Sequence, residues 1–273
     1  MLIDAHQHFW RIGENDCGWP TPDLAAIHRD FEPEDLKAVG ASVGLTGSVL
    51  VQSQPSDRDT DWLLEVAAAE PLVLAVVGWA DLAAPDAPSR IAALARRPKL
   101  RGLRPMLQNL ADAWILQLAL APAIEAMIDH GLSFDALVLP CHLPHLLTFA
   151  QRWPDLSIVI DHGGKPDIAA GTLEPWRADI AALAAQPNMF CKLSGLLTEA
   201  APGQSPTALA PYVAHLVQAF GPARLMWGSD WPVLDLAGDY AAWRMLARDL
   251  SGLSDPADLA ALFGETARRF YRL

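Results

Sequence analysis

The sequence predicts a single parallel α/β barrel, and three observations predict it. Eight short apolar segments of strand length recur along the 273 residues, and a helical segment follows each of them. No change in composition, linker or internal repeat divides the chain. Polar residues gather at the carboxyl ends of the apolar segments, where the active sites of such barrels lie. We therefore expect one (β/α)8 (TIM) barrel over residues 1–273. A doubly wound sheet is the alternative, but the first strand lacks a glycine-rich dinucleotide fingerprint.

The amino-terminal half is expected to hold four strand–helix units. The first strand lies within residues 1–10, and the long loop Arg11–Asp30 after it is expected to cover the mouth of a site. A helix opens at 31–36, where proline and acidic residues suit a first turn. Residues 72–79 are continuously apolar, as in strands buried on both faces of a parallel sheet. The other elements expected here are the strands Gly47–Gln52 and Leu100–Arg104 and the helices Asp59–Glu70, Pro88–Arg97 and Trp114–His130.

The carboxyl-terminal half continues the same alternation. Gly131 follows the preceding helical segment, as glycine commonly does just after a helix. The last helix begins after a capping Ser254-Asp255, with proline at its first position. The expected strands are Leu132–Val138, Leu156–Gly164, Met189–Gly195 and Arg224–Pro232, and the expected helices are Pro144–Trp153, Pro175–Gln186, Ser205–Phe220, Tyr240–Leu250 and Pro256–Tyr271.

Composition excludes several classes of partner. The formal net charge is -12, from 32 acidic and 20 basic residues, and no basic run is present, so neither nucleic acid nor an anionic membrane is expected as a partner. No apolar run reaches the length of a transmembrane helix, and the amino terminus does not resemble a signal peptide. Cys17, Cys141 and Cys191 are widely spaced and odd in number, which predicts free thiols in a reducing cytoplasm.

The first strand carries a His-x-His pair. Because side chains alternate along a strand, Asp4, His6 and His8 point to one face. Two imidazoles about 7 Å apart on one face can converge on a metal ion, a carbonyl oxygen or a carboxylate.

The other expected strand ends carry polar side chains as well. Asp230 is a carboxylate at the end of the eighth strand, where burial demands partners. Asp161 and His162 are neighbours, so we expect only one, His162, to face the barrel axis. Lys165 is either a solvated loop lysine or a substrate contact, and Lys192 is either a structural ion-pair partner or functional. The remaining polar residues at these ends are Gln52, Ser53, Gln54, Arg104, His142 and Ser194, and the aromatic ones that could stack on a sugar-like ring are Trp10, Trp19, Trp79 and Trp231.

Six short motifs in this order resemble the amidohydrolase superfamily. They are similar to its sugar-lactonase branch, with the pyrone dicarboxylate lactonases as relatives. This resemblance implies a barrel of the metallo-dependent hydrolase type, with a hydrolytic site on His6, His8, His162 and Asp230. The motifs are Ile-Asp-Ala-His-Gln-His-Phe-Trp at 3–10, Val51-Gln52, Val-Gly-Trp-Ala-Asp-Leu at 77–82, Leu103-Arg104-Pro105, Ile-Asp-His-Gly-Gly-Lys-Pro at 160–166 and Gly-Ser-Asp-Trp-Pro at 228–232.

One position departs from the family pattern. Metal-dependent members usually carry a lysine or glutamate at the end of the fourth strand to bridge two ions, and here Arg104 stands there. A cationic side chain does not ligate a cation, so a binuclear site is not expected. His6, His8 and Asp230 are left to hold one divalent ion, such as zinc, or to act without any metal, and both alternatives stay open.

The resulting hypothesis is hydrolysis of a sugar-acid lactone. Asp230 would activate the water and later protonate the ring oxygen, while the three histidines, or an ion they bind, would stabilise the oxyanion. Alternatives are a pyrone-dicarboxylate-type lactonase, a lactone isomerase or decarboxylase, and a non-catalytic sugar-binding barrel; the oligomeric state is open. The strand ends favour a neutral, polyhydroxylated lactone, with substrate contacts expected from Gln52, Arg104, Trp10, Trp79, His142, Lys165 and Trp231.

Overall fold

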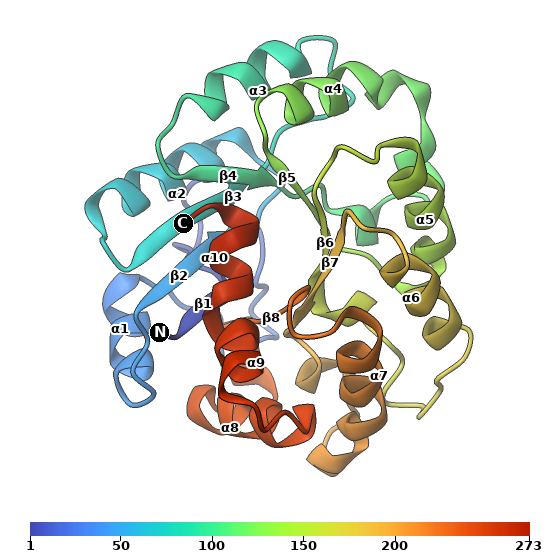
Figure 1. Ribbon diagram of the computed structural model, residues 1–273. Helices are drawn as coiled ribbons and strands as arrows, with labels where there is room; N and C mark the ends of the chain where they lie inside the picture. Colours follow the sequence, from blue (N-terminus) through green and yellow to red (C-terminus); the bar gives the residue numbers. More distant parts are fainter.

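A computed structural model describes residues 1–273 and contains eight strands in the sheet order β1 to β8 (Figure 1). Every neighbouring pair from β1–β2 to β7–β8 is parallel. β8 returns to β1 through a parallel bridge between Gln7 and Trp231, which closes the barrel. The predicted α/β barrel is thereby confirmed. The strands are β1 (Ile3–Gln7), β2 (Gly47–Val51), β3 (Val73–Gly78), β4 (Leu100–Leu103), β5 (Ser133–Ala136), β6 (Ile158–Ile160), β7 (Met189–Leu193) and β8 (Leu225–Trp227).

Helices surround this barrel and bury their apolar faces against the strands (Figure 1). None of them is both long and apolar enough to cross a membrane. They are α1 (Pro33–Ala41), α2 (Asp57–Ala69), α3 (Ala87–Ala95), α4 (Ala121–Asp129), α5 (Leu143–Arg152), α6 (Trp176–Ala184), α7 (Ala210–Phe220), α8 (Tyr240–Ser251), α9 (Pro256–Ala260) and α10 (Thr266–Tyr271).

The long helix predicted at 114–130 is wrong in its first half. Residues 114–120 form two short 3₁₀ turns, and only α4 is α-helical. Pro122 stands in the first turn of α4, and its ring would clash with a carbonyl four residues earlier if the helix ran further back. The last predicted helix, at 256–271, is likewise interrupted at Gly264, which passes close to the backbone of Met1.

The interior of the barrel changes character from one end to the other. At the amino-terminal ends of the strands it is apolar, and Ala267, Phe270 and Tyr271 of α10 close it there (Figure 1). At the carboxyl ends it is filled with buried polar groups, among them His6 and Asp230. The amino-terminal end of the barrel is therefore closed by apolar packing, and the candidate catalytic residues lie at the opposite end.

Candidate active site

The seam between β8 and β1 brings the His-x-His pair to Asp230. The backbone N–H of Asp230 donates to the carbonyl of His6, and the N–H of His8 donates to the carbonyl of Trp231, both at 2.8 Å. With the two strand ends held in register, Asp230 Oδ1 lies 3.3 Å from His8 Nε2 and 3.6 Å from His6 Nε2. His162 Nε2 lies 3.8 Å from the same oxygen. The four predicted catalytic residues thus form one cluster.

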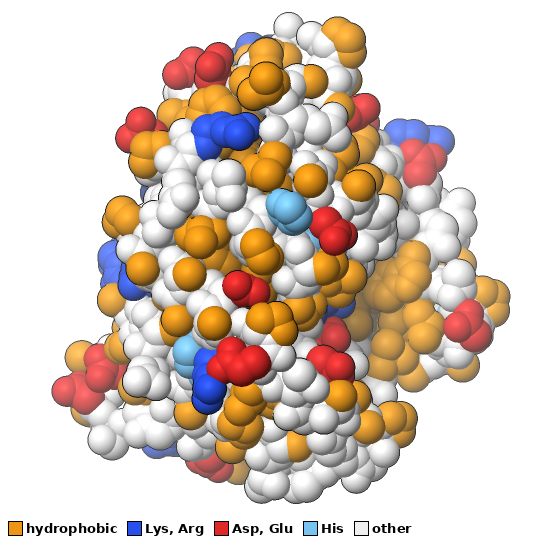
Figure 2. All heavy atoms as spheres, turned by 90° about the vertical axis from the view of Figure 1, so that its right-hand side faces the viewer, with side chains coloured by type: hydrophobic (Ala, Val, Ile, Leu, Met, Phe, Trp, Pro, Cys, Tyr) orange, Lys and Arg blue, Asp and Glu red, His pale blue; other side chains and the backbone are white.

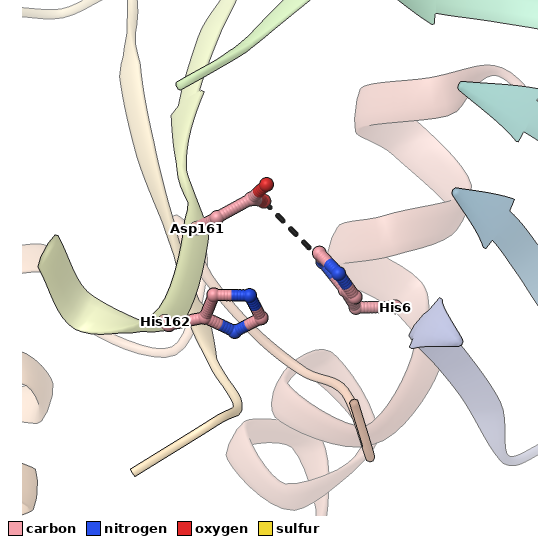
Figure 3. Close-up of side chains that lie close together, drawn as sticks. All are labelled: His6, Asp161 and His162. Atoms are coloured by element: carbon pink, nitrogen blue, oxygen red, sulfur yellow. Dashed lines mark ion pairs between the residues drawn. The ribbon is translucent and has the colours of Figure 1, made fainter. Parts of the chain in front are cut away.

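Asp161 also enters this cluster, which the sequence reasoning missed. His162 adopts a left-handed backbone with φ of 53°, and the two neighbours therefore both turn inward. Figure 3 shows the result: Asp161 Oδ1 lies 3.4 Å from His6 Nδ1, and the His6 and His162 rings stand 4.5 Å apart. The expectation that only one of them faces the axis is wrong, because it assumed a regular extended strand.

Gly195 and Gly228 lie where the backbone passes very close to the side chains of His162 and His6. A Cβ at Gly195 would lie 2.4 Å from His162 Nδ1, and one at Gly228 would lie 2.8 Å from the Cβ of His6. Either side chain would displace a ring of the cluster. Only glycine at positions 195 and 228 therefore leaves the His162 and His6 side chains where the site needs them.

Asp4 holds the segment that carries Asp230. Its carboxylate accepts hydrogen bonds from the N–H and the hydroxyl of Ser229, at 2.8 and 2.6 Å, and from the Tyr240 hydroxyl at 2.8 Å. Asp230 has φ of 61°, a conformation that persists only where surrounding contacts impose it. The Asp4 contacts are of that kind, so Asp4 supports the site without reaching its cavity.

The donor set fits one divalent ion. His8 Nδ1 donates to the carbonyl of Val51 at 2.8 Å, which leaves Nε2 with a free lone pair. His6 Nε2 lies 3.1 Å from it, and with Asp230 these ligand atoms converge within 4.8 Å. Two imidazole nitrogens and a carboxylate oxygen are a ligand set that zinc accepts.

A second ion does not fit the same pocket. The guanidinium of Arg104 reaches to 3.5 Å from His6 Nε2 and 3.4 Å from Asp161 Oδ2, where a bridging ligand would have to act. A guanidinium has no lone pair to offer a metal ion, so Arg104 cannot bridge two ions at this position. The geometry therefore supports the expectation of at most one ion at His6, His8 and Asp230.

Burial determines the charge state of the cluster. It lowers the pKa of His162 to about 4, against the opposing attraction of Asp230. Burial likewise lowers the pKa of His6 well below its usual value. For Asp230 burial acts in the opposite direction, but attraction to His162 and the hydrogen bond with His8 outweigh it and lower the pKa. At neutral pH Asp230 is therefore an ionised carboxylate beside the neutral imidazoles of His6 and His162.

The cluster opens into a cavity of about 330 Å³. Of the predicted substrate-binding residues, Arg104 and Lys165 line it, together with the catalytic His8, His162 and Asp230. Trp19, from the predicted covering loop, forms part of the wall and is held there because Gln54 donates to its carbonyl at 2.7 Å. The other polar lining residues are Ser53, Gln54, Gln108 and Asn109.

Five predicted substrate contacts lie outside this lining. Gln52 donates to the backbone carbonyl of Arg104 at 2.7 Å and so supports a residue of the wall. Trp10 and Trp231 are fully buried among other aromatic rings, and His142 accepts a hydrogen bond from the backbone of its own turn. Trp79 is half-buried. Direct contact of these five with a substrate stays a prediction.

Gln108 and Asn109 were not singled out from the sequence. They belong to a short 3₁₀ turn, Leu107–Asn109, that begins two residues after Pro105. The backbone N–H of Gln108 donates to the carbonyl of Leu137 at 2.9 Å, which turns this segment toward the barrel mouth. No local pattern marks that contact, because its partner lies on the segment after β5.

Asp59 on α2 is a buried carboxylate beside Ser53 and Gln54 of the cavity wall. Burial raises its pKa to about 7, so the folded protein binds a proton that the unfolded chain releases near pH 4. Stability contributed by this group therefore falls as the pH rises from about 4 to 7. We expect Asp59→Asn to raise the melting temperature more at pH 8 than at pH 5.

Asp61→Asn is the matched control, because Asp61 lies on the same helix with an exposed carboxylate. Differential scanning calorimetry at the two pH values measures both variants. An equal shift of Asp59→Asn at pH 5 and pH 8 would contradict the assignment.

Comparison with known proteins places this geometry in a family. A family model described as "Amidohydrolase" matches residues 3–273. The L-fucono-1,5-lactonase of Burkholderia ambifaria is 52% identical over 276 residues, covering 99% of this chain and 95% of that protein. The L-fucono-1,5-lactonase of Burkholderia multivorans is 37% identical over 288 residues, covering 100% and 96%.

A solved structure agrees with these relatives. A Burkholderia multivorans amidohydrolase with bound zinc superposes with a TM-score of 0.94 and 37% sequence identity, covering 100% of this chain and 99% of that one. The match of the family model over almost the whole chain, with the histidine and aspartate cluster at the carboxyl ends of the strands, shows that this chain belongs to the amidohydrolase family.

Proposed function

We propose that this protein hydrolyses the lactone of a sugar acid to the open-chain acid. The observation that carries the proposal is the carboxylate of Asp230, held 3.3 Å from His8 Nε2 at the wall of a cavity lined by three side-chain amides and the hydroxyl of Ser53. The two relatives named as L-fucono-1,5-lactonases support the same reaction, and L-fucono-1,5-lactone is the proposed substrate.

Asp230 acts as the base in the proposed mechanism. It takes a proton from a water molecule, whose oxygen attacks the ester carbonyl, and it later returns the proton to the ring oxygen as that bond breaks. His162 borders the proposed position of the oxyanion, and His6 and His8 would stabilise it through an ion that they hold. A divalent ion held by His6, His8 and Asp230 would polarise the carbonyl and lower the pKa of the water.

The charges of the cavity wall favour a neutral substrate. Arg104 is paired with Asp161 at 3.4 Å, and Lys165 is paired with Glu199 at 3.3 Å. Neither cation is left without a carboxylate partner, whereas a dicarboxylate substrate requires free cations to bind it. The amides of Gln54, Gln108 and Asn109 suit the hydroxyl groups of an aldono-lactone.

The partner in this proposal is a small molecule, and the proposed compartment is the cytoplasm. The three cysteines are unpaired, as a reducing compartment favours. On the face shown in Figure 2, lysine and arginine side chains stand apart from one another among acidic and apolar groups. That surface offers no basic patch of the kind that nucleic acid or anionic lipid recognises.

A panel of lactones tests the proposed function. We expect enzyme-dependent proton release from L-fucono-1,5-lactone and related neutral aldono-lactones, and none above the spontaneous rate from pyrone dicarboxylate. Each substrate is assayed with a pH indicator, with and without a chelator, against a blank without protein. Loss of activity with the chelator and its return with zinc would show that the His6, His8 and Asp230 set requires an ion.

Other outcomes of the panel would contradict the proposal. Conversion of a lactone without proton release would indicate an isomerase. An increase in melting temperature with lactone but no turnover would indicate a sugar-binding barrel. Proton release from pyrone dicarboxylate alone would show that the paired cations of the cavity do bind a dicarboxylate substrate.

A further inference from the structure

A charged side chain that the proposed mechanism does not use lies directly beneath the catalytic cluster. Lys192 of β7 is fully buried, with its ammonium 2.7 Å from Asp135 Oδ2 and 2.9 Å from Asp161 Oδ1. The same ammonium lies 3.3 Å from His6 Nδ1. Burial lowers the pKa of Lys192, but its two carboxylate neighbours raise it above the usual value, so the group is a cation.

The carboxyl-terminal helix reaches this cluster from the opposite end of the barrel. The hydroxyl of Tyr271, in α10, donates to Asp135 Oδ2, the oxygen that also accepts from Lys192. Ser133 donates to the other oxygen of Asp135 at 2.9 Å. A continuous buried path therefore runs from Tyr271 through Asp135 and Lys192 to His6.

Packing alone does not require these charges. Replacing buried ion pairs by apolar residues of similar volume is often neutral or stabilising, because desolvation of the charges is costly. Lys192 pairs with Asp135 and Asp161, Arg104 pairs with Asp161, and both cations reach atoms of the His6 ring. What distinguishes Lys192 is that its contact is with Nδ1, the ring nitrogen facing away from Asp230.

We propose that Lys192 is a positioning residue, which holds the ring of His6 and the carboxylate of Asp161 in place, and that Tyr271 of the carboxyl-terminal helix supports it through Asp135. This inference rests on the proposed lactone hydrolysis. The orientation of His6 Nε2 toward the substrate depends on what binds Nδ1, and partners behind a catalytic or metal-binding imidazole commonly set its orientation. Helix α10 then has two roles: it closes the apolar end of the barrel, and through Tyr271 it helps to position His6.

Lys192→Met combined with Asp135→Asn tests the proposal. Lys192→Met alone would leave two buried carboxylates facing one cation, whereas the double variant removes one charge of each sign. We expect it to fold and its kcat to fall roughly 10- to 100-fold with KM nearly unchanged. Histidine-selective ¹⁵N NMR of the protein as purified should show the side-chain signals of His6 displaced, and this readout does not depend on turnover.

Tyr271→Phe gives a second test that retains every charge. It removes one hydrogen bond to Asp135, and we expect kcat to fall about fivefold with an unchanged KM. Tyr212→Phe is the matched control, because the Tyr212 hydroxyl donates only to backbone carbonyls outside the cluster. Should the double variant fail to fold, this pair decides the question.

The outcomes separate the two proposals. Parental kcat in a folded double variant, or equal kcat in Tyr271→Phe and Tyr212→Phe, would reduce Lys192 to a structural counter-ion. If the unmodified protein turns over no lactone, the proposed function fails. In that case the His6 NMR signals of the double variant, compared with those of the unmodified protein, still test whether Lys192 positions the His6 ring.

Discussion

Replacing Asp230 by asparagine is expected to lower kcat by roughly 10²- to 10⁴-fold, the range that general acid–base catalysis supplies. Asp230 is the carboxylate that contacts both His6 and His8, and it borders the cavity. The amide has nearly the same size but accepts no proton from water. Asparagine also tolerates the left-handed backbone at this position, where φ is 61°, so the fold should persist.

Steady-state kinetics on the preferred lactone measure this effect, with circular dichroism and a melting curve to confirm folding. Asp235→Asn is the control, since Asp235 is an exposed carboxylate five residues further along and does not line the cavity. A folded Asp230→Asn protein with near-parental kcat would exclude Asp230 as the base.

His162→Asn is expected to lower kcat by roughly 10²-fold, the effect of removing one group that stabilises an oxyanion. The His162 ring lines the cavity, with Nδ1 bonded to the Ser194 hydroxyl at 2.9 Å and Nε2 directed to Asp230. Asparagine again suits the left-handed backbone, whose φ is 53°, and its shorter side chain does not reach the position of Nε2.

Ser194→Ala provides a graded comparison for this variant. It leaves the His162 ring in place and removes only the partner of Nδ1, so we expect a smaller fall in kcat, roughly tenfold. Both variants are measured against the same lactone at saturating concentration. If Ser194→Ala lost more activity than His162→Asn, the serine hydroxyl and not the imidazole would act on the substrate.

Local pattern accounts for the predicted residues that the structure brings together in one cluster. Periodicity and turn residues locate the strands, and the carboxyl ends of parallel strands share one face of a barrel. That rule places His6, His8, His162 and Asp230 among the polar residues at the strand ends, and the resemblance to the amidohydrolase superfamily selects these four as the expected hydrolytic site. The predicted helix boundary at Pro122 was less accurate. The helical pattern of apolar residues continues before this proline, but its ring prevents an α-helix from extending back through it.

Backbone conformation accounts for the main error at the site. The prediction that Asp161 turns away from His162 follows from strict alternation along a strand, and the strand in fact ends at Ile160. The left-handed residue after Asp161 depends on contacts from other strands, including the Ser194 hydroxyl and the space above Gly195. No local sequence pattern contains that information, because the contacting residues lie on another strand.

By itself, the sequence of this protein determined the barrel, its strand order and the face on which the polar residues collect, because these depend on periodicity along the chain. Only the tertiary structure decided the partners: Arg104 beside His6, Lys192 between Asp135 and Asp161, and Tyr271 beneath them. Hydrogen bonds and charge pairs form between atoms a few ångströms apart. Such neighbours come from distant strands, and their contacts exist only once the barrel closes.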